Sequence, residues 1–200
     1  MAVITGTDGP DLVDTTSASP GVTGGPATAD ADRIRDRGGD DLLRGGDGPD
    51  LLRGQGGDDR LEGGRGGDTL AGGRGDNTLR GGGGEDAASW RDLDLRDVPP
   101  GAPQVVLNLS GETIRTGFET DVVAVDFLVL SGTAARPTRT GLEVDRLSGL
   151  ERFDGSAGGD DVAFLGGGFA PGGTDAEGFT AYSDGIETIW LRGFETVLIG

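Results

Sequence analysis

The sequence predicts an all-β protein in which short strands stack along one axis and share a narrow apolar interior. Three observations predict this fold. Glycine takes 42 of the 200 positions, without the period of three that marks collagen. A period of nine residues runs through residues 27–89 without an insertion. Each period has one reliably apolar position, so a core forms only when several periods are stacked.

The array consists of seven nonapeptides: ATADADRIR, DRGGDDLLR, GGDGPDLLR, GQGGDDRLE, GGRGGDTLA, GGRGDNTLR and GGGGEDAAS. Its sixth position reads Asp32, Asp41, Asp50, Asp59, Asp68, Asn77, Asp86, and its eighth reads Ile34, Leu43, Leu52, Leu61, Leu70, Leu79, Ala88. Glycine-rich early positions allow a sharp turn with exposed carbonyls. Positions seven to nine predict a short strand whose eighth residue faces inward. A disordered Gly/Asp-rich linker is the alternative, but disorder does not require an aliphatic residue every nine positions.

These repeats resemble the RTX family, whose calcium-binding nonapeptides follow the pattern G-G-x-G-x-D-x-U-x. The resemblance implies a parallel β-roll of nonapeptide repeats, with two repeats per turn and calcium between loops two repeats apart. It implies one column of Asp32, Asp50, Asp68 and Asp86 and a second of Asp41, Asp59 and Asn77, enclosing about five calcium ions. The loop glycines expected to supply carbonyls are Gly46, Gly48, Gly57, Gly64, Gly66, Gly73, Gly75 and Gly84. Asn77 offers no charge, so its site should be the weakest unless Asp76 substitutes.

The composition points to the same ligand chemistry. The chain has 35 acidic and 17 basic residues, a net charge of −18, and no His or Cys; all the basic residues are Arg. Zinc and haem sites, thiol nucleophiles and Ser-His-Asp triads are thereby excluded. Carboxylates and backbone carbonyls, the ligands of calcium, remain abundant. Carboxylates about 4 Å apart repel by about 4 kcal/mol at an effective dielectric near 20, so calcium binding and folding should be one event.

The flanks extend the solenoid. Residues 1–26 are expected to form a capping rung and a loop, because Gly6 to Asp14 fits the nonapeptide template with Asp11 at position six, where it should hold calcium poorly. Residues 90–200 are expected to continue as a β-helix-like C-terminal solenoid. Strands are predicted at Val105–Leu109, Thr120–Leu130 and Gly141–Leu147. A looser repeat of glycine, an apolar residue and glutamate before a strand recurs at Gly117, Gly149, Gly185 and Gly193. Asp161 ends a degenerate calcium loop, and stretches similar to residues 147–161 accompany RTX arrays.

The resemblance also implies a route of export. RTX proteins leave Gram-negative bacteria through type I secretion with an uncleaved C-terminal signal. The N-terminus shows no basic region followed by an apolar one, which agrees with this route. The apolar stretch Trp190 to Gly200 is expected to be that signal, a closing strand that caps the solenoid, or both. Val122 to Leu130, the longest apolar run, is far too short to span a bilayer. We expect an extracellular protein without membrane insertion.

The sequence favours a non-enzymatic function in which calcium is a folding switch. The motif H-E-x-x-H and the nucleophile elbow G-x-S-x-G are both absent. The strong negative charge disfavours nucleic acid as a partner. The arginines of the array (Arg35, Arg44, Arg53, Arg65, Arg74 and Arg80) are expected to pair with neighbouring acids. Two alternatives stay open: a ladder of arginines that binds an acidic polysaccharide such as alginate, and calcium-driven self-assembly into a surface layer or adhesin.

Overall fold

The computed structural model describes residues 1–91, 105–109, 114–119, 124–129, 132–137, 142–156, 161–185, 187–194 and 196–199. All regular structure in these ranges is β-strand, in twenty strands, β1 to β20. The chain divides into two compact units, which are described separately. One comprises Met1–Ser89 and Asp145–Arg152, and the other comprises Trp90–Val144 and Phe153–Gly200. Within the described ranges, no helix has the length and apolar character needed to cross a membrane.

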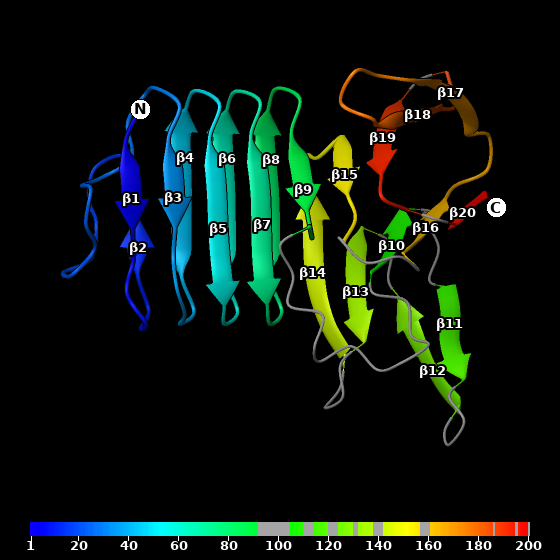
Figure 1. Ribbon diagram of the computed structural model, residues 1–200, viewed down its shortest axis with the longest axis horizontal. Helices are drawn as coiled ribbons and strands as arrows, with labels where there is room; N and C mark the ends of the chain where they lie inside the picture. Colours follow the sequence, from blue (N-terminus) through cyan, green and yellow to red (C-terminus); the bar gives the residue numbers. More distant parts are fainter. Residues whose placement is uncertain are drawn as a thin grey trace. The chain divides into compact units, whose positions relative to one another are not determined.

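The first unit is a parallel β-roll, as the sequence predicts. Two sheets lie face to face and the chain alternates between them (Figure 1). One sheet has the order β1 (Val3–Thr5), β3 (Arg33–Arg35), β5 (Leu51–Gly56), β7 (Thr69–Arg74) and β9 (Ala87–Ser89). The other has the order β2 (Leu12–Val13), β4 (Leu42–Asp47), β6 (Arg60–Arg65), β8 (Thr78–Gly83) and β14 (Leu142–Ser148).

The register shows why nine is the sequence period and eighteen the structural one. Leu52 of β5 pairs with Leu70 of β7, and Leu43 of β4 pairs with Leu61 of β6, all in parallel. Each strand therefore lies beside the strand two nonapeptides further on. Two repeats make one turn, and equivalent residues of successive turns form columns.

The core of the roll consists of the position-eight side chains. These are fully or almost fully buried at Ile34, Leu43, Leu52, Leu61, Leu70, Leu79 and Ala88, and Ile4 and Val13 extend the same stack. The residues on either side of position eight face outward, as the alternating burial of β4 and β5 shows. The interior is only one aliphatic side chain wide per strand, so the loops must supply much of the remaining stabilisation.

Both ends of the roll contain rungs outside the regular array. At one end β1 pairs with β3 and β2 with β4, so that the predicted rung of Gly6 to Asp14 is in place although residues 15–26 interrupt the period. At the other end Leu147 of β14 pairs in parallel with Leu79 of β8. The predicted strand Gly141–Leu147 thus adds a rung that the sequence separates widely from the array.

The second unit mixes parallel and antiparallel strands. β10 (Val106–Leu109), β16 (Val162–Leu165) and β20 (Thr196–Ile199) form a parallel ladder, and β13 (Thr133–Pro137) pairs antiparallel to β10. β15 (Arg152–Asp154) neighbours β19 (Thr188–Arg192), which pairs antiparallel to β18 (Thr180–Ser183), itself antiparallel to β17 (Ala170–Thr174). β11 (Ile114–Glu119) and β12 (Ala124–Val129) pair antiparallel. The buried apolar residues of this unit include Trp90, Leu107, Phe153, Leu165 and Ile189.

The looser glycine–glutamate repeat does not mark a parallel rung at every occurrence. The motifs that begin at Gly149, Gly185 and Gly193 precede β15, β19 and β20, and β20 is parallel to β16. Gly117 instead lies inside β11, opposite Asp126 of the antiparallel β12, so the expectation of a parallel rung there is wrong. The chain between β11 and β12 is too short for the crossover that a parallel pair needs. The predicted strand Thr120–Leu130 is described only at 124–129.

Candidate metal centre

The turns of the roll have a backbone conformation that glycine provides. From Gly45 onward, positions two and four of each nonapeptide have positive φ, and so does every glycine expected to line a calcium site: Gly46, Gly48, Gly57, Gly64, Gly66, Gly73, Gly75 and Gly84. Gln55, at position two, is the one non-glycine residue with positive φ in the described chain. A Cβ at Gly64 or Gly66 would collide with the carbonyl oxygen of the same position one turn earlier. The loops therefore stack with their carbonyls directed along the axis.

The position-six side chains are buried inside these turns. Their exposed fractions are 1–3% from Asp32 to Asp86, and Asn77 is fully buried. Each accepts a hydrogen bond from the backbone N–H of position six one turn earlier. The N–H of Asp50 donates to Oδ1 of Asp68 at 2.8 Å, and the N–H of Asp68 donates to Oδ1 of Asp86 at 2.8 Å. The N–H of Asp41 donates to Oδ1 of Asp59 at 3.0 Å in the second column. The predicted columns are thus brought together as hydrogen-bonded ladders.

The second oxygen of these carboxylates has no partner. Oδ2 is buried without a hydrogen bond at Asp41, Asp50, Asp59, Asp68 and Asp86. Leaving a buried charged oxygen unsatisfied is costly, and such groups in folded proteins are normally paired or bound to metal. Five equivalent exceptions in one repeat array indicate a missing positive charge.

Burial also shifts the pKa values of these aspartates. Burial, reinforced by neighbouring carboxylates, raises the pKa of Asp50 and Asp68 to about 6 and that of Asp59 to about 8. Burial also raises the pKa of Asp41 and Asp86. A bound cation would reverse this preference for the neutral form.

The donor set fits calcium. Each loop offers a buried carboxylate oxygen together with backbone carbonyls, and it contains no sulfur or nitrogen ligand. Hard cations prefer this set, and the flexible coordination of calcium suits it better than the strict octahedron of magnesium. The arrangement can therefore coordinate a hard cation with oxygen ligands alone.

Asn77 has an amide where the other position-six residues have a carboxylate, and its hydrogen bonds differ accordingly. Its Oδ1 accepts the N–H of Asp59 at 3.0 Å, as an aspartate would. Its amide nitrogen stands where the other loops have a free oxygen, and it donates to Oδ1 of Asp145 at 2.8 Å. The amide nitrogen is hydrogen-bonded, and the side chain offers one oxygen fewer than an aspartate; the weaker calcium site expected here stays a prediction.

Two residues that we did not identify from the sequence continue the columns. Asp145 follows Asn77, whose N–H lies 3.3 Å from its Oδ1, and Glu151 follows Asp86, whose N–H donates to its Oε2 at 2.9 Å. Their signal was available: Asp145-Arg-Leu147 and Glu151-Arg-Phe153 repeat the acid–x–apolar pattern of positions six to eight. This pattern is hard to recognise in the sequence because no glycine-rich loop precedes the acids and because the two acids are six residues apart instead of nine.

Asp11 and Asp32 lie in the columns but have a different environment. Oδ2 of Asp32 accepts hydrogen bonds from the N–H and the hydroxyl of Thr28, and the N–H of Ala2 donates to Oδ1. Oδ2 of Asp11 likewise accepts the N–H and the hydroxyl of Thr7. Both threonines occupy position two, where most other loops have glycine. Burial opposes ionisation of Asp32, but these hydrogen bonds outweigh it and lower the pKa.

Asp161 lies in the second unit and is fully buried. Its Oδ1 accepts the N–H of Val105 at 2.9 Å, and both of its oxygens accept hydrogen bonds from Ser156. The rest of its predicted loop, residues 157–160, lies outside the described residues. Asp161 thus has a position-six environment in which both oxygens are already satisfied.

Comparison with known proteins agrees with this geometry. The RTX calcium-binding nonapeptide repeat family matches in four copies, over residues 27–61, 35–70 and 62–87. No curated protein matches the chain. The matched segment covers the loops whose aspartates carry the unpartnered oxygens.

Proposed function

We propose, from the premise that residues 27–87 are RTX calcium-binding nonapeptide repeats, that this is a secreted β-roll protein whose folding is driven by calcium outside the cell. The observation that carries the proposal is the row of buried, unpartnered Oδ2 atoms at Asp41, Asp50, Asp59, Asp68 and Asp86. Calcium would supply the positive charge that these oxygens lack. The carboxylates, with the carbonyls of positions two and four, would hold about five ions.

Folding and binding are coupled by the construction of the roll. Without a cation, closing each turn buries a negatively charged carboxylate close to other carboxylates, which is unfavourable. The burial of one apolar side chain per strand offsets only a small part of this free-energy cost. In the unfolded chain the acids are solvated and separated. Because the loops come together only in the fold, the free energy of calcium binding is also free energy of folding.

This coupling suits an exported protein. At low cytosolic calcium the chain should remain unfolded and competent for type I secretion. Extracellular calcium is close to the millimolar affinities of extracellular modules, so folding would follow export. The proposed role is structural rather than catalytic, since the site provides cation ligands only.

The test is a calcium titration from EDTA followed by far-ultraviolet circular dichroism, with magnesium as the control. We expect a cooperative gain of β signal with calcium and little response to magnesium at equal concentration. A chain that is already folded in EDTA and does not change with calcium would refute the proposal.

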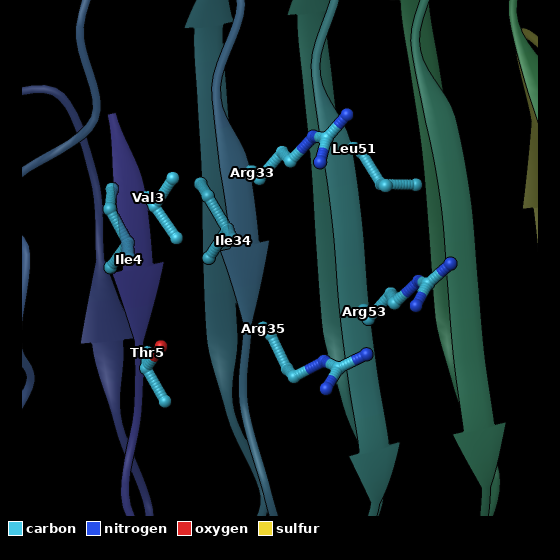
Figure 2. Close-up of a pocket in the computed structure, with 8 residues that line it drawn as sticks. All are labelled: Val3, Ile4, Thr5, Arg33, Ile34, Arg35, Leu51 and Arg53. Carbon is cyan, nitrogen blue, oxygen red and sulfur yellow. The ribbon is translucent and has the colours of Figure 1, made fainter. Parts of the chain in front are cut away.

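A second candidate function rests on the outer face of the sheet that contains β1, β3 and β5. An open hollow of about 430 Å³ there is lined by Val3, Leu51 and three arginines, Arg33, Arg35 and Arg53, among others. Figure 2 shows the arginine side chains extending in the same direction across the sheet. On the opposite sheet, by contrast, Arg44, Arg60 and Arg80 all lie within 4 Å of Glu62.

Guanidinium groups spaced along parallel strands beside an apolar floor fit the carboxylates of an acidic polysaccharide. The test compares Arg33→Ala/Arg35→Ala with Arg60→Ala/Arg65→Ala, which removes the same charge from the other sheet. Alginate in a native gel should retard the second variant like the wild type and the first variant less. Equal retardation of both variants would refute this second function.

A further inference from the structure

Three buried acids meet between the first rung of the roll and the rung that follows it in the same sheet. The exposed fractions of Asp11, Asp36 and Asp41 are 5%, 0% and 3%. One carboxylate oxygen from each lies within 4.8 Å of those of the other two. The sequence pattern indicates only a poor calcium site at Asp11 and gives Asp36 no role.

Asp36 is a departure from the repeat. It occupies position one, which is glycine in each of the five nonapeptides from Gly45 to Ser89. In regular loops the space beside that glycine is filled by position six of the same loop, as by Asp50 beside Gly45. Beside Gly6, the space is filled by the carboxylate of Asp36 from the next rung. Asp36 therefore extends inward, toward the preceding turn.

The oxygens of this cluster are incompletely satisfied. Oδ1 of Asp36 accepts the N–H of Arg37 at 2.8 Å, and Oδ1 of Asp41 accepts the N–H of Asp11 at 2.7 Å. Oδ2 of Asp36 and Oδ2 of Asp41 are buried without a partner. Among the described residues, no arginine forms an ion pair with any of the three acids. The cluster thus holds three acids and no balancing charge.

We propose that Asp11, Asp36 and Asp41 bind one divalent cation, calcium by preference, as a site additional to those of the repeat loops. The inference deepens the proposed function and rests on it in part, because Asp41 also belongs to the second column. Its new element is Asp36, a side-chain ligand where the repeat has glycine.

The donor chemistry sets the preference. Three carboxylates provide only hard oxygen donors, and Oδ2 of Asp36 and Oδ2 of Asp41 are buried without a partner. Calcium accepts irregular sets of six to eight oxygens, which these groups and water can complete, whereas magnesium requires an octahedron. Because affinity rises with the number of charged ligands, this site should bind calcium more tightly than a loop with a single carboxylate.

The test counts bound calcium by native mass spectrometry and isothermal titration calorimetry on the full chain. Asp36→Gly restores the residue that the repeat has at position one, so the backbone should accept it. Asp36→Asn keeps the shape and one oxygen, and serves if the glycine variant folds poorly. The control is Asp47→Asn, which removes one charge from an exposed side chain at position three of the next loop.

We expect both Asp36 variants to bind one calcium ion fewer than the wild type, with the tightest binding phase lost and the β signal at saturating calcium retained. Asp47→Asn should bind as many ions as the wild type. An equal number of ions in all four proteins would overturn this inference and leave the repeat sites standing. Loss of every ion together with the fold in both variants would also overturn it. A wild type that binds no calcium would refute the proposed function itself.

Discussion

In the first rungs of the roll, Asp32 is held by Thr28 at position two, whereas the middle rungs have no threonine there and leave Oδ2 of Asp50, Asp59 and Asp68 without a partner. The burial of the acids is nearly the same in both regions. What differs is the source of the compensating interaction. The hydroxyl and the N–H of Thr28 satisfy the carboxylate locally, but a loop without that threonine leaves its carboxylate to a cation. The comparison teaches that calcium dependence belongs to particular loops and not to the roll as a whole.

The largest effect should come from the glycine backbone of the regular loops. Gly84 has φ +141°, and a Cβ there would meet the carbonyl oxygen of Gly66. Gly84→Ala should cost about 1–3 kcal/mol from the backbone conformation alone, with the steric collision in addition. Its neighbour Gly83 is the matched control, since a Cβ there would have its nearest such atom 4.0 Å away. Urea unfolding in saturating calcium measures both, and equal midpoints would show that the loops are not closely stacked.

The next effect separates the two regions directly. Asp59→Asn removes an unpartnered buried oxygen, and Asn77 shows that the loop accepts an amide. We expect its calcium midpoint to rise by about tenfold, or about 1.4 kcal/mol. Asp32→Asn weakens hydrogen bonds to Thr28 and Ala2 and should cost about 1.5–3 kcal/mol of stability while the number of bound ions stays the same.

The repeat pattern alone predicts equal roles for these two aspartates, so calorimetric ion counts decide between the two accounts. If Asp32→Asn lost an ion and Asp59→Asn did not, the distinction between loops with and without a threonine at position two would be wrong.

Acidity should act on the two regions in opposite directions when calcium is absent. The pKa of Asp50 and Asp68 is raised to about 6 and that of Asp59 to about 8 in the fold, above the value of about 3.9 in an unfolded chain. The calcium-free fold therefore binds more protons, and lowering the pH from 8 toward 4 stabilises these rungs. The pKa of Asp32 is lowered, so its contribution is present above about pH 4 and is lost as the pH falls further.

Circular dichroism in EDTA should show β signal increasing from pH 8 to pH 5. With calcium at its midpoint concentration the trend should reverse, because protons then compete with the ion. A pH-independent signal in EDTA would contradict the burial of these carboxylates in the metal-free roll.

Most of the roll could be predicted from the sequence, because its fold depends on a local rule repeated every nine residues. Position eight gave the core and position six the columns of acids. Side-chain environments that depart from this nine-residue rule could not be predicted. Thr28 satisfies Asp32 by its place in the loop, and Asp145 joins the column through a strand that is distant in sequence. Beyond the array no period fixes the pairing, and the antiparallel pairing of β11 with β12 was missed for that reason.

The smallest effect concerns the outer surface of the roll, where arginines rather than calcium balance the acids. Glu62 accepts hydrogen bonds from Nε of Arg44 at 2.8 Å and from Nη2 of Arg60, and Nη1 of Arg80 lies 3.8 Å away. Although burial opposes ionisation, Arg44 and Arg60 lower the pKa of Glu62. Glu62→Gln should cost about 0.5–1 kcal/mol, the upper part of the range for surface pairs, because three cations share one acid.

Glu85→Gln, which removes the pair between the exposed Glu85 and Arg152, is the control and should cost less, because one cation rather than three faces this acid in the pairs compared. Urea unfolding in saturating calcium at low salt and in about 1 M sodium chloride measures both, since salt at that concentration screens exposed charges within about 3 Å. If Glu62→Gln still destabilised the protein in high salt, the interaction of Glu62 would not be an exposed, screened one. The distinction between turns that depend on a cation and a surface whose acids are paired with arginine would then be wrong.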